Sequence, residues 1–394
     1  MAETRAAGAP LRVGHSFPEW LPLTQTWMYN LVRYLPSDEI ESHVLCEITA
    51  NLDRFGVPHL HSAEREPGLV RLWDRGLRWT GLRRHDGFLV RAGRRAGVRL
   101  LHSHFGNIGW LDIGAARRLG ARHVVTFYGF DVSRLPQEDP RWRARFAELF
   151  RGVDAVLCEG SHMGRSVAAL GCDPAKIHVH HLGVRTDEIE YRPRVRAPGE
   201  PLRVLIAASF REKKGIPDAI AALGRVRGEI PVELTIIGDA GSEAASRAEK
   251  SRILAALAEQ GLESRTRLLG YQPHDVLFRE AYAHHVFLSP SVTASDGDTE
   301  GGAPVSLIDM AASGMPIVST THCDIPEIVL HERTGLLAAE RDVPALAAHL
   351  RRLAAHPESW APMVEAGRRH VEREYDAREQ GRRLAALYRR LVGT

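Results

Sequence analysis

The feature that most constrains the fold is a regular alternation of short apolar runs with longer helical patterns along the whole chain. Short runs rich in β-branched residues are typical of buried strands, and helices between them indicate parallel crossovers. The strands predicted for the first half are Leu11–Phe17, Leu100–Phe105, Val124–Tyr128, Ala155–Glu159 and Ile177–Leu182. Those predicted for the second half are Leu202–Ser209, Glu233–Gly238, Thr266–Gly270, Val286–Pro290, Ile317–Thr321 and Gly335–Ala338. The pattern predicts an α/β protein with parallel sheets covered by helices on both faces.

The alternation is interrupted once, by the polar, proline-containing stretch Tyr191–Pro201. This stretch divides the 394 residues into two parts of similar size, as expected for a chain too long for one core. We predict a first doubly wound domain over 1–192 and a second over 193–375. The last helical pattern, Val371–Leu391, is expected to bring segment 376–394 back to the first domain. Ligands of such sheets bind beyond the carboxyl ends of the strands, so the expected site is a cleft between the two domains.

Composition and charge narrow the classes of partner. The chain is 44% hydrophobic and 26% charged, which is typical of a soluble globular protein. Its net charge of +3 is too small to indicate a nucleic-acid-binding protein. The segment from Arg65 to Arg122, however, contains thirteen arginines and only four acidic residues. Two interpretations stay open here, a solvated helical surface or a patch for an anionic acceptor or a membrane surface.

The cysteines and the N-terminal residues bear on the compartment. The four cysteines are scattered, which suits a reducing environment: Cys46, Cys158, Cys172 and Cys323. The first residues lack the apolar core of a signal peptide, and no apolar run has the length of a transmembrane helix. We therefore expect a cytoplasmic protein, with a peripheral position at the inner membrane face as the second expectation.

The strongest chemical signal is a glycine-rich segment that leads into a helical pattern. Gly301, Gly302 and Pro304 precede an apolar run, which Gly314 and Pro316 bring to an end. Backbone N–H groups of the two glycines would lie near the positive end of this helix. The absence of side chains there lets a ligand approach the backbone closely. Such a helix start is suited to binding a diphosphate.

Charged side chains accompany this segment. Glu300 precedes the expected helix and Asp309 lies within it. Their carboxylates would accept hydrogen bonds from the hydroxyls of a sugar and a ribose, worth roughly 1.5–3 kcal/mol each. A basic loop, Arg211–Lys214, follows an expected strand and precedes an expected helix, so it is a second candidate anion site. The alternatives are a solvated helix start and an ordinary basic loop.

Together these segments resemble the retaining glycosyltransferases of family 4, which have the GT-B fold of two doubly wound Rossmann-like domains facing a central cleft. The matching segments are Glu212–Gly215, Glu300–Asp309, Gly314–Pro316, Asp324–Val329, Thr334–Leu337, His181–Val184 and Pro290-Ser291. The resemblance implies transfer of a hexosyl group from a nucleoside diphosphate sugar, UDP- or GDP-linked, with retained anomeric configuration. It also implies a sugar, lipid-linked or small-molecule acceptor, in the synthesis of a polysaccharide, a glycolipid or a natural-product glycoside.

The resemblance also implies a role for each matched residue. Lys214 would neutralise the diphosphate, assisted by Arg211, and Glu300 would bind the donor sugar. Asp309 would bind the ribose, and Gly270 would lie near the base. The remaining donor contacts are assigned to Gly301, Gly302, Ala303 and Pro304. No cofactor besides the donor and no metal is expected, because no cluster of histidine, aspartate and glutamate has convincing ligand spacing.

The sequence departs from the family pattern in the second domain. Asp309 stands where the family has a glutamate and lies nine positions after Glu300 instead of eight. Ser209 stands where an arginine is usual.

The first domain departs as well. Tyr128 takes the place of a histidine and is assigned a catalytic role. Thr24 and Thr26 stand in place of a glycine-rich loop and, with Asp131, are assigned to the acceptor side.

Two histidines at a predicted strand end are a further candidate. His102 and His104 precede the end of the strand Leu100–Phe105. We expect one of them to point toward the cleft and the other into the packing. His104 is the one predicted to contact the reacting groups.

The departures keep two other functions open. A non-catalytic protein that binds a nucleotide sugar, or acts as a scaffold, would bind nucleotide without transfer or hydrolysis. A nucleotide-sugar epimerase of the same fold would change the donor sugar without any acceptor. It would need carboxylates and a base placed for work on the sugar ring, and the sequence contains no clear set of these.

Overall fold

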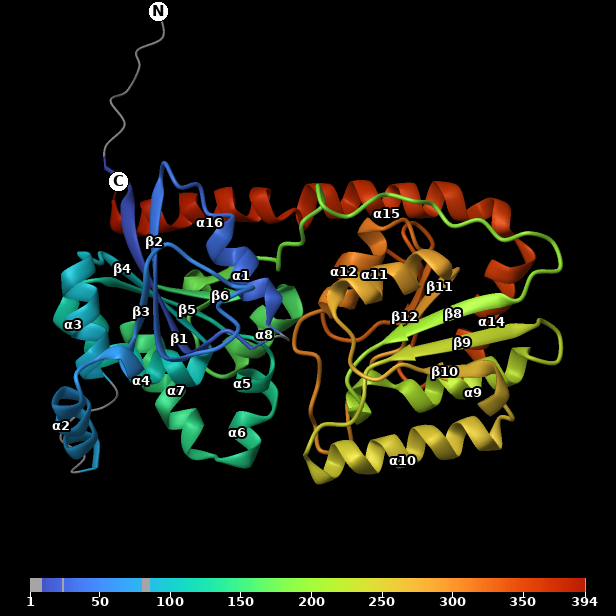
Figure 1. The fold of residues 1–394 in the computed structure, drawn as a ribbon, viewed down its shortest axis with the longest axis horizontal. Helices are drawn as coiled ribbons and strands as arrows, with labels where there is room; N and C mark the ends of the chain where they lie inside the picture. The colour runs from blue at the N-terminus through green and yellow to red at the C-terminus, as the bar shows by residue number, and fades with distance from the viewer. Residues whose placement is uncertain (1–8, 23–24, 80–85, 394) are drawn as a thin grey trace, which may run out of the picture. The chain divides into compact units, whose positions relative to one another are not determined.

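The computed structural model describes residues 9–22, 25–79 and 86–393, which form two compact units (Figure 1). Unit 1 comprises Met1–Gly183 together with Ala377–Thr394, and unit 2 is the continuous stretch Val184–Asp376. Within the described part of the chain, no helix is both long enough and apolar enough to span a bilayer.

Unit 1 contains a parallel seven-stranded sheet with the strand order β3-β2-β1-β4-β5-β6-β7. Its strands are β1 (Leu11–Trp20), β2 (Ile40–Thr49), β3 (Leu60–Ser62), β4 (Leu100–His104), β5 (Arg122–Thr126), β6 (Ala155–Cys158) and β7 (Ile177–Val179). Its α-helices are α1 (Thr26–Arg33), α2 (Gly68–Trp79), α3 (Asp86–Ala96), α4 (Gly106–Leu119), α5 (Phe130–Ser133), α6 (Leu135–Glu138), α7 (Arg141–Gly152), α8 (Ser161–Ala169) and α16 (Ala377–Val392). Strands β2 and β3 lie outside the segments that the sequence pattern predicted.

Unit 2 contains a parallel six-stranded sheet with the strand order β10-β9-β8-β11-β12-β13. Its strands are β8 (Leu202–Ala207), β9 (Val232–Ile237), β10 (Thr266–Leu268), β11 (Val286–Ser289), β12 (Ile317–Thr320) and β13 (Leu336–Ala338). Its α-helices are α9 (Ile216–Val226), α10 (Ala244–Glu259), α11 (His274–Ala283), α12 (Val305–Ala312), α13 (Ile325–Ile328), α14 (Val343–Ala355) and α15 (Trp360–Glu374).

The predicted α/β class with parallel sheets is confirmed in both units. All the predicted strands are present, and most of them end one to three residues earlier than predicted. Buried aliphatic side chains from strands and helices form the core of each unit. The burial of both sheet faces explains why the strands appear in the sequence as nearly continuous apolar runs.

The last helical pattern is interrupted, which corrects the prediction of one helix over Val371–Leu391. Helix α15 ends at Glu374 and α16 begins at Ala377. Between them, the carbonyl of Tyr375 accepts a hydrogen bond of 2.8 Å from the N–H of Val184, which draws the backbone out of the helical pattern. Helix α16 then packs in the core of unit 1, where Leu384 and Tyr388 are buried with residues of β4, β5 and β6.

Candidate active site

The basic loop of unit 2 is held against the end of a neighbouring strand by one glycine. Gly215 follows the short 3-10 helix Glu212–Lys214 and has a φ of +60°. A Cβ atom added to Gly215 would lie 1.9 Å from the carbonyl oxygen of Pro290, which follows β11. Only glycine fits so close an approach with this backbone conformation. The loop therefore brings Lys213 and Lys214 to the carboxyl end of β11.

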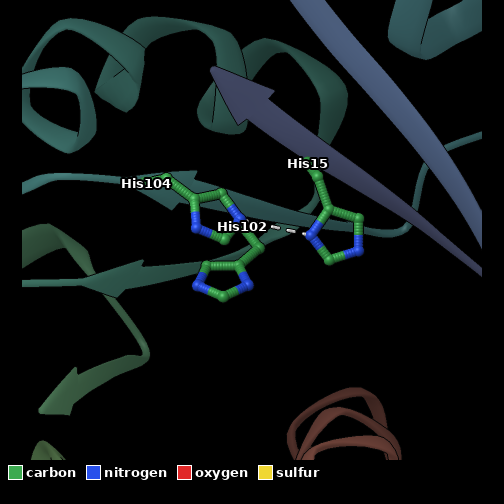
Figure 2. A group of neighbouring side chains, drawn as sticks. All are labelled: His15, His102 and His104. Atoms are coloured by element: carbon green, nitrogen blue, oxygen red, sulfur yellow. Dashed lines mark hydrogen bonds between the residues drawn. The ribbon is translucent and has the colours of Figure 1, made fainter. Parts of the chain in front are cut away.

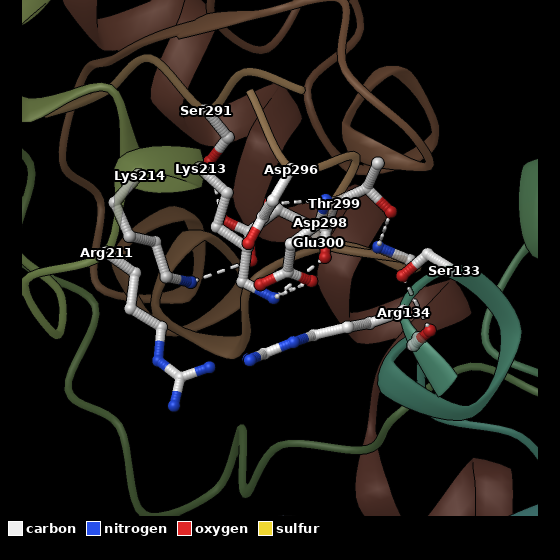
Figure 3. Close-up of polar contacts among 12 residues, drawn as sticks. Ser133, Arg134, Arg211, Lys213, Lys214, Ser291, Asp296, Asp298, Thr299 and Glu300 are labelled. Carbon is white, nitrogen blue, oxygen red and sulfur yellow. Dashed lines mark hydrogen bonds and ion pairs between the residues drawn. The ribbon is translucent and has the colours of Figure 1, made fainter. Parts of the chain in front are cut away.

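Lys214 and Glu300 form an ion pair at this position (Figure 3). The Nζ atom of Lys214 lies 2.7 Å from Oε2 of Glu300, and Ser291 donates a hydrogen bond of 2.7 Å to Oε1. The Glu300 side chain is 6% exposed and that of Lys214 is 17% exposed. The carboxylate predicted to bind the sugar and the amine predicted to bind the diphosphate are thus brought into direct contact.

Lys213 contacts residues 298–300, the acidic segment that includes Glu300, at a second point. Its Nζ atom lies 3.1 Å from Oδ1 of Asp298 and donates a hydrogen bond of 2.8 Å to the carbonyl oxygen of Thr299. Figure 3 shows Lys213 and Lys214 both directed toward this segment. The resulting electrostatic field acts on Glu300. Burial raises its pKa, but Lys214 and Lys213 outweigh that effect and hold the pKa below the ordinary value of a glutamate. Glu300 is therefore ionised at neutral pH and able to accept hydrogen bonds.

His322, which no sequence motif indicated, positions the backbone of Glu300. The N–H of Glu300 donates to Nε2 of His322 at 3.1 Å, so this nitrogen acts as an acceptor. The other ring nitrogen, Nδ1, lies 2.6 Å from Oε1 of Glu340 and donates to it. Glu340 also accepts a hydrogen bond of 2.7 Å from the N–H of Thr293. A chain of contacts thus runs from β13 through the loop after β12 to the acidic segment.

We expect His322→Ala to lower the rate of the sugar transfer that the resemblance implies by about tenfold, which corresponds to roughly 1.4 kcal/mol. The physical reason is that the N–H of Glu300 loses its acceptor, so the carboxylate is held less firmly. Steady-state kinetics with the donor varied would measure the effect. The matched control is His356→Ala, because His356 is an exposed histidine of the same unit that pairs with Glu358. Equal rates for both variants and the unchanged protein would contradict the positioning role.

The glycine-rich segment leads into α12 largely as predicted. The helix begins at Val305, directly after Pro304, and Gly314, with a φ of +80°, follows its end. Gly301 and Gly302 are buried and lie before the first turn of the helix. The N–H of Gly301 donates to Oγ1 of Thr299 at 3.2 Å, so part of its hydrogen-bonding capacity is used within the loop. Ala303 and Pro304 are half-buried between these glycines and the helix.

Asp309 lies on the buried side of α12 with 6% of its area exposed. Its Oδ2 atom is 3.3 Å from Nε2 of His274, the first residue of α11. No sequence motif indicated His274, because it lies 35 residues from Asp309. The structure thus places an imidazole beside the carboxylate assigned to the ribose.

The remaining predicted donor residues, Gly270 and Arg211, lie in loops of unit 2. The carbonyl of Gly270 accepts a hydrogen bond of 2.8 Å from the N–H of Gly238, which joins the loops after β9 and β10. Arg211 is directed toward α10, where both carboxylate oxygens of Glu243 lie 3.2 Å from its guanidinium. Apart from Asp309, the predicted donor residues follow the carboxyl ends of strands in unit 2, the edge where ligands of such sheets bind.

The predicted residues of unit 1 form a buried group. His104 and Tyr128 are joined by a hydrogen bond of 2.6 Å between Nδ1 and the hydroxyl oxygen. Asp131 is fully buried and accepts hydrogen bonds from the backbone N–H groups of Gly106, at 2.6 Å, and Tyr128, at 2.9 Å. Burial, partly offset by these bonds, raises the pKa of Asp131 to about 6. Asp131 therefore braces two loops of unit 1 and presents no surface to an acceptor.

The expectation that His102 and His104 point in different directions is wrong. Residues two apart on a strand lie on the same face of the sheet. Both side chains are fully buried, and their ring centroids are 4.2 Å apart. His102 contacts the hydroxyl groups of Tyr388 and Thr126, each at 2.6 Å. His104 thus belongs to a packed polar cluster and is not a surface group.

His15 completes this cluster, which Figure 2 shows. Its Nδ1 atom lies 3.4 Å from Nε2 of His104, and its Nε2 atom has no partner. Among the residues that the structure describes, His15, His102 and His104 are the group whose ligand atoms could hold a metal, since these atoms lie within 4.8 Å of one another. Both ring nitrogens of His102 are already hydrogen-bonded, so a metal would have to displace one of these bonds. The contacts favour a hydrogen-bonded core over a metal site.

The threonines assigned to the acceptor side have different outcomes. Thr26 is the first residue of α1 and is half-buried. Thr24 lies outside the described residues.

Comparisons with known proteins cover both units. Residues 24–188 match the family described as "Glycosyltransferase Family 4", and residues 201–356 match the one described as "Glycosyl transferases group 1". The chain is 34% identical over 292 residues to the amylovoran biosynthesis glycosyltransferase AmsK of Erwinia amylovora, covering 73% of this chain and 69% of AmsK. It is 33% identical over 298 residues to the putative colanic acid biosynthesis glycosyltransferase WcaL of Escherichia coli, covering 73% and 70% of the two chains.

Solved structures resemble the fold at low sequence identity. Sucrose-phosphate synthase from Thermosynechococcus elongatus matches with a TM-score of 0.74 and 17% identity, covering 97% of this chain and 99% of the other. Anabaena HepE, solved in complex with UDP and glucose, matches with a TM-score of 0.72 and 13% identity, covering 96% and 99%. These likenesses concern the fold alone.

Proposed function

Because the chain belongs to the family 4 glycosyltransferases of group 1 and has the GT-B fold, we propose that it transfers a hexosyl group from a nucleoside diphosphate sugar to an acceptor hydroxyl with retained anomeric configuration. The observation that carries the proposal is the ion pair between Lys214 and the ionised, buried Glu300 at the carboxyl ends of the unit 2 strands. The amine supplies positive charge for a diphosphate, and the carboxylate supplies hydrogen-bond acceptors for the hydroxyls of a sugar.

Donor binding would rearrange this pair. A diphosphate brings negative charge to Lys214, which then shares its hydrogen bonds between the phosphate oxygens and Glu300. Glu300 is left with lone pairs for the hydroxyls of the sugar, and Ser291 and His322 keep it in place. Asp309, on the buried side of α12, is the group proposed for the ribose.

The transfer step exchanges one bond of the anomeric carbon for another. The bond to the phosphate oxygen breaks, and the diphosphate leaves with the electron pair. The acceptor oxygen forms the new bond and gives up its proton to an oxygen of the departing diphosphate. The developing charge lies on the diphosphate, so the amine of Lys214 stabilises the transition state more than the ground state.

The relatives guide the choice of substrates to propose. HepE has been solved with UDP and with UDP-glucose, which makes UDP the first nucleotide to test and GDP the second. AmsK is named as a glycosyltransferase of amylovoran biosynthesis, and WcaL as a putative one of colanic acid biosynthesis. We therefore propose a saccharide acceptor, free or lipid-linked, in polysaccharide synthesis, with no cofactor beyond the donor.

Nucleotide binding provides the first test. UDP or GDP at about 100 times its dissociation constant is expected to stabilise the folded protein by roughly 2.7 kcal/mol, seen as a raised midpoint of thermal unfolding. ADP and TDP serve as matched nucleotides. No shift with any of the four would contradict donor binding.

The outcome with the bound donor then separates the candidate functions. Transfer with a product of the same anomeric configuration as the donor, determined by proton NMR, supports the proposal, and an inverted product contradicts retention. Tight binding with neither transfer nor hydrolysis indicates a binding or scaffold protein. Conversion of the donor sugar without an acceptor indicates an epimerase.

A further inference from the structure

His274 lies at the end of the unit 2 sheet where ligands bind, and it is open to solvent. It is the first residue of α11, which follows the loop after β10. Its side chain is 42% exposed. Gly270 lies in the same loop, and a Cβ atom added there would have no described atom within 4 Å. The surface beside this loop is therefore open to a ligand at the carboxyl ends of the parallel strands.

Asp309, in contrast, is withdrawn from solvent. Its side chain is 9% exposed, and it is shorter by about 1.5 Å than the glutamate that the family pattern has at this position. The Nε2 atom of His274 lies 3.3 Å from its Oδ2 atom. A ligand that approaches from solvent therefore meets the imidazole before it meets the carboxylate.

Two contacts fix the ring of His274. Phe278 lies one helical turn further along α11, and the centroids of the two rings are 4.8 Å apart. A carboxylate can only accept hydrogen bonds, so Nε2 carries a proton and donates it to Asp309. In the neutral imidazole the other ring nitrogen, Nδ1, is then an acceptor. It has no hydrogen-bond partner among the residues that the structure describes.

We propose that Nδ1 of His274 accepts a hydrogen bond from a ribose hydroxyl of the donor nucleotide, and that Asp309 holds the ring in the tautomer that this contact requires. A hydroxyl fits Nδ1 because it can donate, whereas the oxygens of an ionised phosphate only accept. Asp309 thus serves the ribose through His274, which makes Asp309 a positioning residue and compensates for its shorter side chain. The inference rests on the proposed function, since it assigns a contact to the nucleotide of the donor.

Nucleotides that lack one ribose hydroxyl test the contact. Calorimetric titration of the full chain with UDP, 2′-deoxy-UDP and 3′-deoxy-UDP gives three dissociation constants. The unchanged protein is expected to bind UDP at least about tenfold more tightly than one of the two analogues, because a site built for a hydroxyl rejects a ligand without it. If GDP is the nucleotide that binds, GDP and its deoxy forms replace this series.

His274→Gln is the decisive variant, because its amide N–H can still donate to Asp309 while the Nδ1 acceptor is lost. It is expected to weaken binding of UDP by about tenfold and to change binding of the discriminated analogue by less than about twofold. The ratio of the two dissociation constants should therefore fall to about one. The double variant H274Q/D309N should lose no more than H274Q, because both residues act through one hydrogen bond.

The matched control is His356→Gln. His356 is also a histidine of unit 2 that contacts a carboxylate, with its Nδ1 atom 3.0 Å from Oε1 of Glu358, and its side chain is 61% exposed. This variant should bind all three nucleotides as the unchanged protein does. The thermal midpoints of both single variants should equal that of the unchanged protein, since both histidines are exposed.

Separate outcomes would overturn this inference and the proposed function. An equal loss for UDP and both analogues in H274Q would indicate a structural role and overturn the inference alone. Full discrimination in H274Q, or a further tenfold loss in H274Q/D309N, would overturn it in favour of direct contact between Asp309 and the ribose. Equal binding of UDP and both analogues by the unchanged protein would overturn it as well. No binding of any nucleotide would contradict the proposed function together with the inference.

Discussion

Replacing Lys214 by alanine is expected to reduce sugar transfer by about a hundredfold or more, which corresponds to roughly 2.7 kcal/mol of transition-state stabilisation. The reason is that its Nζ atom, 2.7 Å from Glu300, is the positive group proposed to face the leaving diphosphate. Glu300→Gln is expected to have a loss of similar size, because the amide cannot replace a carboxylate as acceptor for sugar hydroxyls. Initial rates at saturating donor would measure both.

Folding stability distinguishes a catalytic role from a structural one. Removing one member of a buried ion pair leaves the other charge uncompensated and costs about 3–5 kcal/mol. The double variant K214Q/E300Q removes both charges and is expected to recover much of this stability, measured by urea unfolding, while transfer stays lost. Recovery of transfer in the double variant would contradict the catalytic assignment.

The control for the loss of a lysine is Lys250→Ala. Lys250 is 41% exposed and pairs with Asp239 at the surface of unit 2. Its replacement is expected to leave transfer unchanged, because a surface ion pair contributes little. A loss as large as that of Lys214→Ala would show that the assay responds to general damage.

Acid is expected to destabilise unit 1 strongly between pH 7 and pH 5. Burial lowers the pKa of His15 to about 3 and that of His123 to about 4, and it lowers the pKa of His102 and His104 well below the ordinary value of 6.5. In the folded protein these rings are neutral, whereas in the unfolded chain they bind protons below pH 6.5. Stability is therefore present above pH 6.5 and is lost as the pH falls toward the folded-state values.

The expected size of this effect at pH 5 is about 2 kcal/mol for each of His15 and His123, and the lowered pKa values of His102 and His104 act in the same direction. Even the part from His15 and His123 is a large share of the stability of a typical domain. Urea unfolding at pH 7, 6 and 5, read in unit 1 by pulse-labelling hydrogen exchange of the β4 peptides, would measure it. An unfolding free energy of unit 1 that is the same at pH 7 and pH 5 would contradict the neutral cluster.

A single substitution tests the origin of the pH dependence. His15→Leu removes one titrating ring whose Nε2 atom has no partner, so it should reduce the slope of stability against pH by about one proton. His356→Leu, at an exposed histidine, is the matched control and should leave the slope unchanged.

The elements that local sequence patterns determine were predictable. Every strand that was predicted from an apolar run is present in the structure. The order Gly, Gly, Pro before an apolar run correctly indicated the start of α12 at Val305. Gly215 and Gly314 stand at turns with positive φ, where glycine has a direct physical reason.

What escaped prediction depends on contacts between distant parts of the chain. His322 reaches Glu300 across a strand connection, and His15 reaches His104 from 89 positions away, so no spacing rule links them. Asp131 is of a residue type that often contacts substrates. Here its carboxylate instead accepts hydrogen bonds from the backbone N–H groups of Gly106 and Tyr128 and so holds two loops together. The misjudged His102 and His104 had a local cause, because the two-residue period of a strand places them on one face.

The membership of α16 in unit 1 has a consequence for how the protein is made. Unit 2 is one continuous stretch, Val184–Asp376, so all of its residues have been synthesised before α16 emerges from the ribosome. Unit 1, although begun first, waits for the last helix, whose Leu384 and Tyr388 cover Leu100, Val124 and Leu157. During that interval the sheet of unit 1 leaves apolar side chains open to water, and this nascent intermediate is where chaperones are expected to act.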